Sequence, residues 1–243
     1  MKHSAISWTN HTFNPWVGCE KISAGCAHCY AETMMSARFH RVRWGRDEAR
    51  MRTSPDNWMQ PLKWNHEAQK LGLRPRVFCA SLADVFEDRD DLVPWRGELH
   101  QLIEQTPHLI WLLLTKRPEV AARYYRSHAI PENVWLGTTV ENRDAIKRIP
   151  ILAGIPAAVR FLSCEPLIED LGALPLVRID WLIAGGESGH GHRHVEADWL
   201  RNLRDQCAAT SIPFFFKQWG GLRPKQNGNT LDGQIHEEVP GMH

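Results

Sequence analysis

Three of the six cysteines lie within eleven residues of one another and have the spacing of metal ligands. They are Cys19, Cys26 and Cys29, in the pattern C-x6-C-x2-C. Thiolates are soft ligands that suit iron–sulfur clusters and zinc. Three ligands leave one metal position open, as in a catalytic zinc site or a [4Fe–4S] cluster held by three cysteines. The pattern predicts a metal site with room for a further ligand, and we favour a cluster over zinc.

Other interpretations of this loop stay open. His28 could complete a Cys3His zinc site, although its place between the paired cysteines would strain the turn, and the three thiols could also be unligated. The other cysteines, Cys79, Cys164 and Cys207, are scattered and behave as small apolar residues. A disulfide scaffold would be shorter and denser in cysteine.

Seven short runs rich in Val, Ile, Phe and Leu predict the buried strands that position this loop. The runs are 5–9, 76–81, 109–115, 134–139, 159–163, 181–184 and 213–216, and helical patterns occupy 92–106, 118–127, 143–152 and 198–210. Strands that alternate with helices predict parallel β–α units. We expect an α/β fold, a partial or full TIM-type (β/α) barrel with an N-terminal iron–sulfur cluster loop.

The expected domain organisation is one barrel with a short tail. The barrel spans 1–219 and includes the cluster loop at 16–32. The extension 220–243 is rich in Gly, Asn and Pro, and Asn227-Gly228 predicts a hairpin turn there.

The opening of the chain resembles the radical S-adenosylmethionine (SAM) enzymes: an N-terminal strand, a three-cysteine loop ending in C-x2-C-aromatic, then alternating strands and helices. The aromatic residue is Tyr30. A narrower match covers nearly the whole chain and is to a family of phage and prophage proteins of largely unassigned function. Its segments are 8–32, 114–118, 163–167, 185–189 and 216–220.

The radical SAM resemblance implies that the cysteines hold a [4Fe–4S] cluster whose free iron chelates SAM. Reduction then yields a 5′-deoxyadenosyl radical that abstracts a hydrogen atom, so the difficult chemistry belongs to the cofactor. Tyr30 corresponds to a residue near the adenine, and a core aromatic is its alternative role. The spacing departs from the commoner C-x3-C-x2-C. The Gly-Gly-Glu motif usual after the second strand is absent, since Gly185-Gly186-Glu187 comes much too late.

Polar residues at the strand ends are similar to the SAM site of the DNA photoproduct lyases in the same superfamily. Ser81, Lys116 and Thr139 follow the second, third and fourth strands. The resemblance implies that they hold the methionine end of SAM, with Asp84 in the same group. Lys116 is a suitable partner for a carboxylate because it is a point charge on a flexible stem.

A second group of strand-end residues is predicted to act on the substrate. Glu165, Glu187, Lys217 and Gln218 are candidates for gripping its polar edge. Cys79 and Cys164 lie near strand ends and are candidate hydrogen-atom donors, with a buried structural role as the alternative. The predicted catalytic set is Cys79, Cys164, Glu165, Glu187 and Lys217.

A basic stretch, residues 38–52, follows the cluster loop with six Arg against two acids. Arg forks bind phosphates and Trp44 could stack on a base, so Arg41, Arg43, Trp44 and Arg46 are predicted to bind nucleic acid. A solvated helix face is the alternative. The formal net charge is only +1, which excludes binding of polyanions through bulk charge alone.

These observations together predict a radical SAM enzyme that modifies a nucleic-acid base. The phage-like resemblance suggests DNA hypermodification by rearrangement or isomerisation of a modified thymidine. The alternatives are photoproduct-lyase-type repair and a non-catalytic, zinc-structured nucleic-acid-binding protein. The expected cofactors are the [4Fe–4S] cluster and SAM, and the expected partners are DNA and an electron donor such as flavodoxin or ferredoxin. No apolar run is long enough to span a membrane and no signal peptide is evident, so we expect a cytoplasmic protein.

Overall fold

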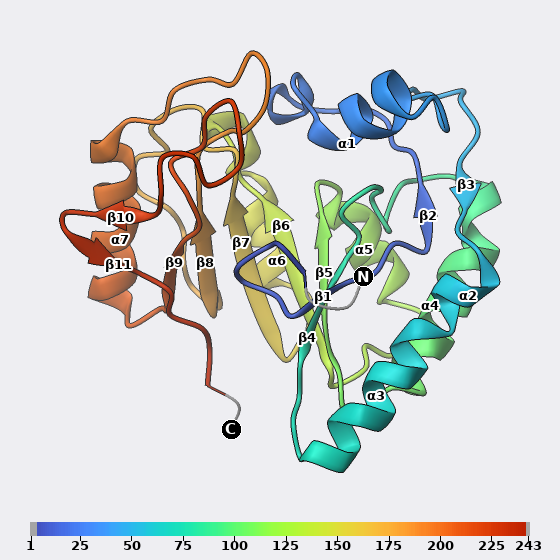
Figure 1. The fold of residues 1–243 in the computed structure, drawn as a ribbon. Coiled ribbons are helices and arrows are strands. Elements are labelled where there is room, and N and C mark those ends of the chain that lie inside the picture. Colours follow the sequence, from blue (N-terminus) through green and yellow to red (C-terminus); the bar gives the residue numbers. More distant parts are fainter. Residues whose placement is uncertain (1–3, 242–243) are drawn as a thin grey trace.

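The computed structural model describes residues 4–241, and a seven-stranded parallel sheet lies at its centre (Figure 1). The strands are β1 (His11–Thr12), β4 (Arg76–Cys79), β5 (Ile110–Thr115), β6 (Val134–Thr139), β7 (Val159–Cys164), β8 (Trp181–Ala184) and β9 (Phe214–Phe216). They lie side by side in chain order, and each neighbouring pair is parallel. Within the described residues the two outermost strands, β1 and β9, do not pair with each other, so the barrel is not closed. The α/β class and the partial TIM-type barrel are therefore confirmed, as a curled half-barrel.

Helices cover one face of this sheet. They include α3 (Gln60–Leu71), α4 (Val93–Glu104), α5 (Pro118–Tyr124), α6 (Arg148–Ala153) and α7 (Ala197–Thr210), with a short α2 (Pro55–Trp58). Four of these match predicted helical patterns, whereas α3 was not predicted. The segment expected to begin at residue 143 is first a 3-10 turn, Arg143–Ala145, because the Asn142 side chain accepts from the Ala145 amide. The α-helix α6 then begins at Arg148.

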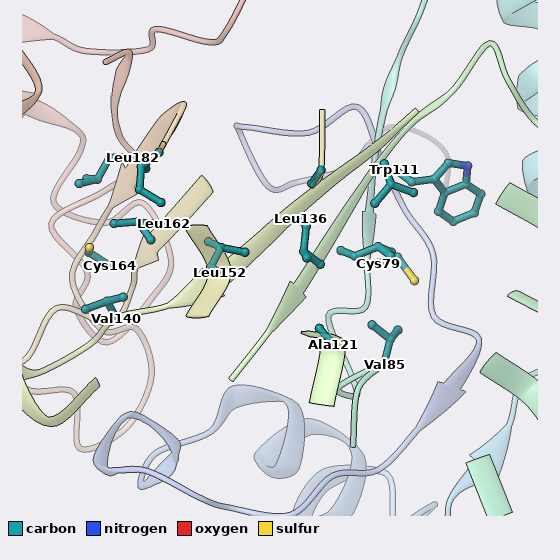
Figure 2. Close-up of a cluster of buried hydrophobic side chains, with 14 of the residues drawn as sticks. Cys79, Val85, Trp111, Ala121, Leu136, Val140, Leu152, Leu162, Cys164 and Leu182 are labelled. Atoms are coloured by element: carbon teal, nitrogen blue, oxygen red, sulfur yellow. The ribbon is translucent and has the colours of Figure 1, made fainter. Parts of the chain in front are cut away.

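Two apolar layers use alternate residues of the strands. On the helix-covered face, Leu136, Leu162 and Leu182 pack with Leu152 of α6 (Figure 2). A separate cluster on the opposite face contains large rings and branched chains, namely Trp8, Phe78, Ile110, Leu112, Trp135, Phe161, Trp181, Ile183 and Phe215. Because successive side chains of a strand point to opposite faces, this division gives each strand residue a known direction.

The predicted strand at 5–9 is wrong. These residues form turns, and the first strand is the two-residue β1, which pairs with Val77 and Phe78 of β4. The reason is the Trp8 ring, which lies 4.6 Å from the Phe78 ring and 6.4 Å from the Trp181 ring. Those rings come from strands far apart in the sheet, so Trp8 fills the concave side of the half-barrel.

The C-terminal extension forms a hairpin, but with a different turn from the predicted one. Strands β10 (Thr230–Leu231) and β11 (Gln234–Ile235) are joined by Asp232 and Gly233, which have φ of 51° and 78°. Two positive φ values match the primed turns of two-residue hairpins. Asn227-Gly228 instead lies before β10. The boundary at residue 220 stays a prediction.

The chain after the hairpin covers the edge strand β9. The Phe216 amide donates to the His236 carbonyl at 2.8 Å, and Phe215 bridges Glu237 in antiparallel sense. Backbone pairing of this kind removes the open edge of a sheet. No helix in the described part of the chain combines the length and the apolar character needed to cross a bilayer.

Candidate functional site at the carboxyl ends of the strands

The strand residues that face the concave side of the sheet are followed, at the carboxyl ends of the strands, by a ring of polar residues. Lys116 follows Leu112 and Leu114 in the same alternation, and Glu165 follows Phe161. The residues with this parity include Lys116, Thr139, Glu141, Glu165 and Lys217. These side chains therefore gather on the concave side where parallel β/α sheets place their sites.

The cysteine loop lies across these strand ends. It follows β2 (Trp16–Val17), contains the 3-10 turn Ala24–Cys26, and leads into α1 (Tyr30–Glu32) at one end of the sheet (Figure 1). The Gly18 amide donates to the Leu82 carbonyl at 3.0 Å, and Arg193 Nη1 donates to the Ala24 carbonyl at 3.0 Å. The Gly18 backbone thus ties the start of the cysteine loop to the loop after β4, and the Arg193 side chain ties its middle to the loop after β8.

The three cysteines of the loop are reduced and partly buried. Burial raises the pKa of the Cys19 thiol to about 12, helped by the Asp84 and Glu87 carboxylates and opposed by Arg117. Burial likewise raises the pKa of Cys29. These thiols are therefore protonated at neutral pH unless a metal displaces the proton.

The chemistry of the donors fits an iron–sulfur cluster, because three thiols on one loop form a soft, incomplete ligand set. The ligand geometry itself is not formed in this structure. Among residues 4–241, no three His, Cys, Asp or Glu side chains lie close enough to share a metal ion.

Ser81 and Tyr30 meet beside the loop. The Tyr30 hydroxyl donates to the Ser81 carbonyl at 2.7 Å, and the residue as a whole is 53% exposed. Asn14, which sequence reasoning missed, hydrogen-bonds the Ser81 hydroxyl and accepts from the Leu82 amide at 2.8 Å. Tyr30 is thus a surface residue at the site and not a core aromatic.

Asp84 is buried and organises the turn that carries Lys116. Its carboxylate accepts from the Thr115 hydroxyl at 2.7 Å, the Lys116 amide at 3.1 Å and Arg117 Nη1 at 3.0 Å. The Phe86 amide is a fourth donor. Since these groups occupy both oxygens, Asp84 positions Lys116 and is not itself presented to a ligand, contrary to its place in the predicted cofactor set.

Lys116 pairs with a strand-end carboxylate that is not among the predicted site residues. Its Nζ lies 3.3 Å from Oε1 of Glu141, and Arg148 Nη1 donates to Oε2 of Glu141 at 2.9 Å. The Glu141 side chain is fully buried, and Lys116 is about one-fifth exposed. Burial alone would raise the pKa of Glu141, but the charges of Lys116 and Arg148 outweigh it and lower the pKa. Two cations thus face one carboxylate.

Glu165 and Lys217 form an ion pair across the site. Lys217 Nζ lies 2.5 Å from Oε1 of Glu165, and each side chain is about one-sixth exposed. The neighbouring Gln218 is buried, donates to the Ser188 hydroxyl and accepts from the Lys225 amide. The pair therefore offers a donor and an acceptor at the concave surface, whereas Gln218 holds loops together.

Glu187 also contacts the chain itself. Arg193 donates to both of its oxygens, and His28 Nδ1 lies 3.4 Å from Oε2. Since Arg193 also bonds the Ala24 carbonyl, Glu187 anchors the cysteine loop. The predicted catalytic role of Glu187 stays a prediction.

Cys79 and Cys164 lie on the helix-covered face. Both are completely buried and point into the apolar cluster with Ala121, Val140 and Leu152 (Figure 2). Burial strongly raises the pKa of both thiols. The structure therefore corrects the prediction that they donate hydrogen atoms: their parity turns them away from the concave site.

The arginine-rich stretch is only partly a surface, because Arg50 is buried and pairs with Glu87. Arg41, Arg43 and Arg46 are exposed, and the structure records no ion pair for them within residues 4–241. Arg41 lies over the exposed Phe39 ring at 5.8 Å. Trp44 packs partly against a small cluster that includes Val42, so less of its ring is open for stacking than predicted.

The comparisons with known proteins agree with this geometry. Residues 3–240 match the profile of a family described as "Protein of unknown function (DUF5131)". The chain belongs to this family. No curated protein matches significantly.

Solved structures of spore photoproduct lyase share the fold. One mutant with bound AdoMet and dinucleoside spore photoproduct has a TM-score of 0.51 and 12% identity, over 82% of this chain and 61% of that one. A second mutant, with the dinucleoside photoproduct, has a TM-score of 0.52 and 13% identity, over 84% and 62%. This DUF5131 chain thus has a half-barrel fold like that of spore photoproduct lyase and spans about three-fifths of the length of those lyases.

Proposed function

We propose that this protein is a radical SAM enzyme that acts on a base in DNA. One observation carries the proposal: a three-cysteine loop lies over the carboxyl ends of a parallel half-barrel, beside a lysine in an electropositive setting. The likeness of the fold to spore photoproduct lyase supports it.

Cys19, Cys26 and Cys29 would hold a [4Fe–4S] cluster, which together with SAM supplies a 5′-deoxyadenosyl radical. Lys116 binds the SAM carboxylate. Its ammonium has three donors and makes one contact at 3.3 Å, and one positive charge remains after Arg148 and Lys116 together neutralise Glu141. The carboxylate of bound SAM would neutralise this remaining positive charge.

Neighbouring residues orient the rest of SAM. Asp84 fixes the backbone of Lys116. Ser81, held by Asn14, and Thr139, on the concave register of β6, face the methionine end. Tyr30 presents its ring beside them for the adenine.

The substrate base would lie against Glu165 and Lys217, whose charges match the polar edge of a base. Arg41, Arg43 and Arg46 would bind phosphates flanking it, and an electron donor such as flavodoxin or ferredoxin would reduce the cluster. Cytoplasmic action stays a prediction.

Two reactions suit this site. The first is DNA hypermodification by rearrangement or isomerisation of a modified thymidine. The second is photoproduct-lyase-type repair, which the fold likeness favours specifically. Mass spectrometry of DNA nucleosides from cells with and without the protein tests the first. Incubation of the reconstituted protein with SAM, reductant and ultraviolet-irradiated DNA tests the second.

Colour distinguishes this proposal from a zinc-structured binding protein. Anaerobically purified protein should be brown and contain iron and sulfide. A colourless protein with stoichiometric zinc would overturn the proposal.

A further inference from the structure

Glu141 contacts the cysteine loop as well as the two cations. The Ser23 hydroxyl, 118 residues earlier in the chain, donates to Oε1 of Glu141, the oxygen that Lys116 also faces. The Glu141 backbone carbonyl accepts from Ile168 at 3.0 Å, which fixes the residue from the β7 side. One buried carboxylate thus joins the loop, the end of β5 and helix α6.

The loop comes so close that only glycine fits at residue 25. A methyl group there would lie 2.7 Å from Cγ and 3.0 Å from Cδ of Glu141. An exposed glutamate could swing aside from such a contact. Glu141 is fully buried and held at both oxygens, so it has no free direction in which to move.

Burying an ionised carboxylate away from water costs free energy unless the group is ion-paired and hydrogen-bonded. Lys116 and Arg148 meet that requirement from the barrel side and leave a negatively charged acceptor directed at the loop. A hydrogen bond to an ionised acceptor is stronger than one between neutral groups.

We infer that Glu141 is a positioning residue that seats the cysteine loop on the barrel through Ser23 and the close packing of Gly25. This inference deepens the proposed function, because the seated loop carries all three thiols. Since Lys116 and Ser23 both contact Oε1 of Glu141, this contact with the loop also lies next to the proposed site for the SAM carboxylate.

The test compares Glu141→Gln, Ser23→Ala and Gly25→Ala with wild type. Glu169→Gln is the matched control, because the Glu169 carboxylate accepts from the Arg143 backbone and does not bond the cysteine loop. Hydrogen–deuterium exchange of amides 19–29 is measured in reduced, metal-free protein. This readout reports on the seat whether or not a cluster is bound.

We expect exchange in 19–29 to be at least tenfold faster in the three variants and unchanged in the control. The double variant Gly25→Ala/Glu141→Gln should exchange no faster than the single variants, because all act on one contact. Amides of β5 should exchange as in wild type in every variant, which shows that the barrel is folded.

A second readout uses reconstituted protein. The electron paramagnetic resonance spectrum of the reduced cluster should change on adding SAM in wild type and in Glu169→Gln, and the change should be lost or reduced in Glu141→Gln. If amides 19–29 of Ser23→Ala exchange at the wild-type rate, the inference that Glu141 seats the loop is overturned. This holds even if Glu141→Gln fails to fold. A wild-type protein that binds no iron would overturn the proposed function and leave the exchange result standing.

Discussion

Lys116 Nζ lies 3.3 Å from Oε1 of Glu141, and the Ser23 hydroxyl of the cysteine loop donates to the same oxygen. The residue proposed to bind SAM and the loop proposed to bind the cluster therefore share one buried acceptor. This arrangement places the two halves of the proposed cofactor site next to each other, although they are far apart in sequence.

Loss of one loop cysteine should prevent cluster assembly. Cys26→Ala should contain much less iron and sulfide than wild type after anaerobic reconstitution, because two thiols cannot hold the cluster. The matched control is Cys207→Ala, since Cys207 is buried on α7 away from the loop. Iron content in Cys26→Ala equal to wild type would remove Cys26 from the ligand set.

Lys116→Ala should keep the cluster but bind SAM more weakly by about 1.5–3 kcal/mol, the usual worth of a hydrogen bond to a charged group. Calorimetric titration of reconstituted protein measures this difference. Equal affinity would assign the carboxylate to another residue. Arg117 is a poor substitute, because its guanidinium already pairs with Asp84 at 3.0 Å and Glu20 at 3.6 Å.

The exposed arginines should make DNA binding depend on salt. Phosphate contacts release counterions, so log affinity falls with log salt by roughly 0.7–0.9 per phosphate. Replacing Arg41, Arg43 and Arg46 with Gln should flatten this slope and leave SAM cleavage without substrate intact. The slope is measured by DNA titration at several salt concentrations.

A matched triple variant controls for charge. Arg74, Arg126 and Arg223 are also exposed, so their replacement with Gln removes the same charge elsewhere. The control should keep the wild-type slope. If both triple variants flatten it equally, net charge and not this surface governs binding.

Packing of the concave layer should be sensitive at Gly137. A methyl group there would overlap the Phe161 ring, and both residues are buried between strands. Gly137→Ala should therefore lower the free energy of unfolding by about 1–3 kcal/mol through overpacking. Urea denaturation measures the change.

Gly97 in α4 provides the comparison for this substitution. A methyl group there meets nothing within 4 Å. Gly97→Ala should raise stability by up to about 1 kcal/mol, because alanine favours the helix. Equal effects at the two positions would contradict the packing explanation.

Much of this molecule could be predicted from local pattern. The apolar runs at 109–115, 134–139 and 159–163 predict buried strands, which the structure has at 110–115, 134–139 and 159–164, and the alternating helices require them to be parallel. The cysteine spacing likewise predicts a metal-binding loop from the chain alone. The alternation of side chains along each strand can also be read from the sequence. It does not show which alternate residues face the concave side until the sheet is folded.

Tertiary structure decided the rest. Cys79 and Cys164 have the right place along their strands and the wrong face, which only packing against the helices shows. The 5–9 run resembles a strand but turns, because Trp8 is needed to fill the concave side. The contact between Glu141 and Ser23 has no local signature, since 118 residues separate the two. Contacts of that separation depend on how the half-barrel curls, and neither periodicity nor spacing along the chain encodes them.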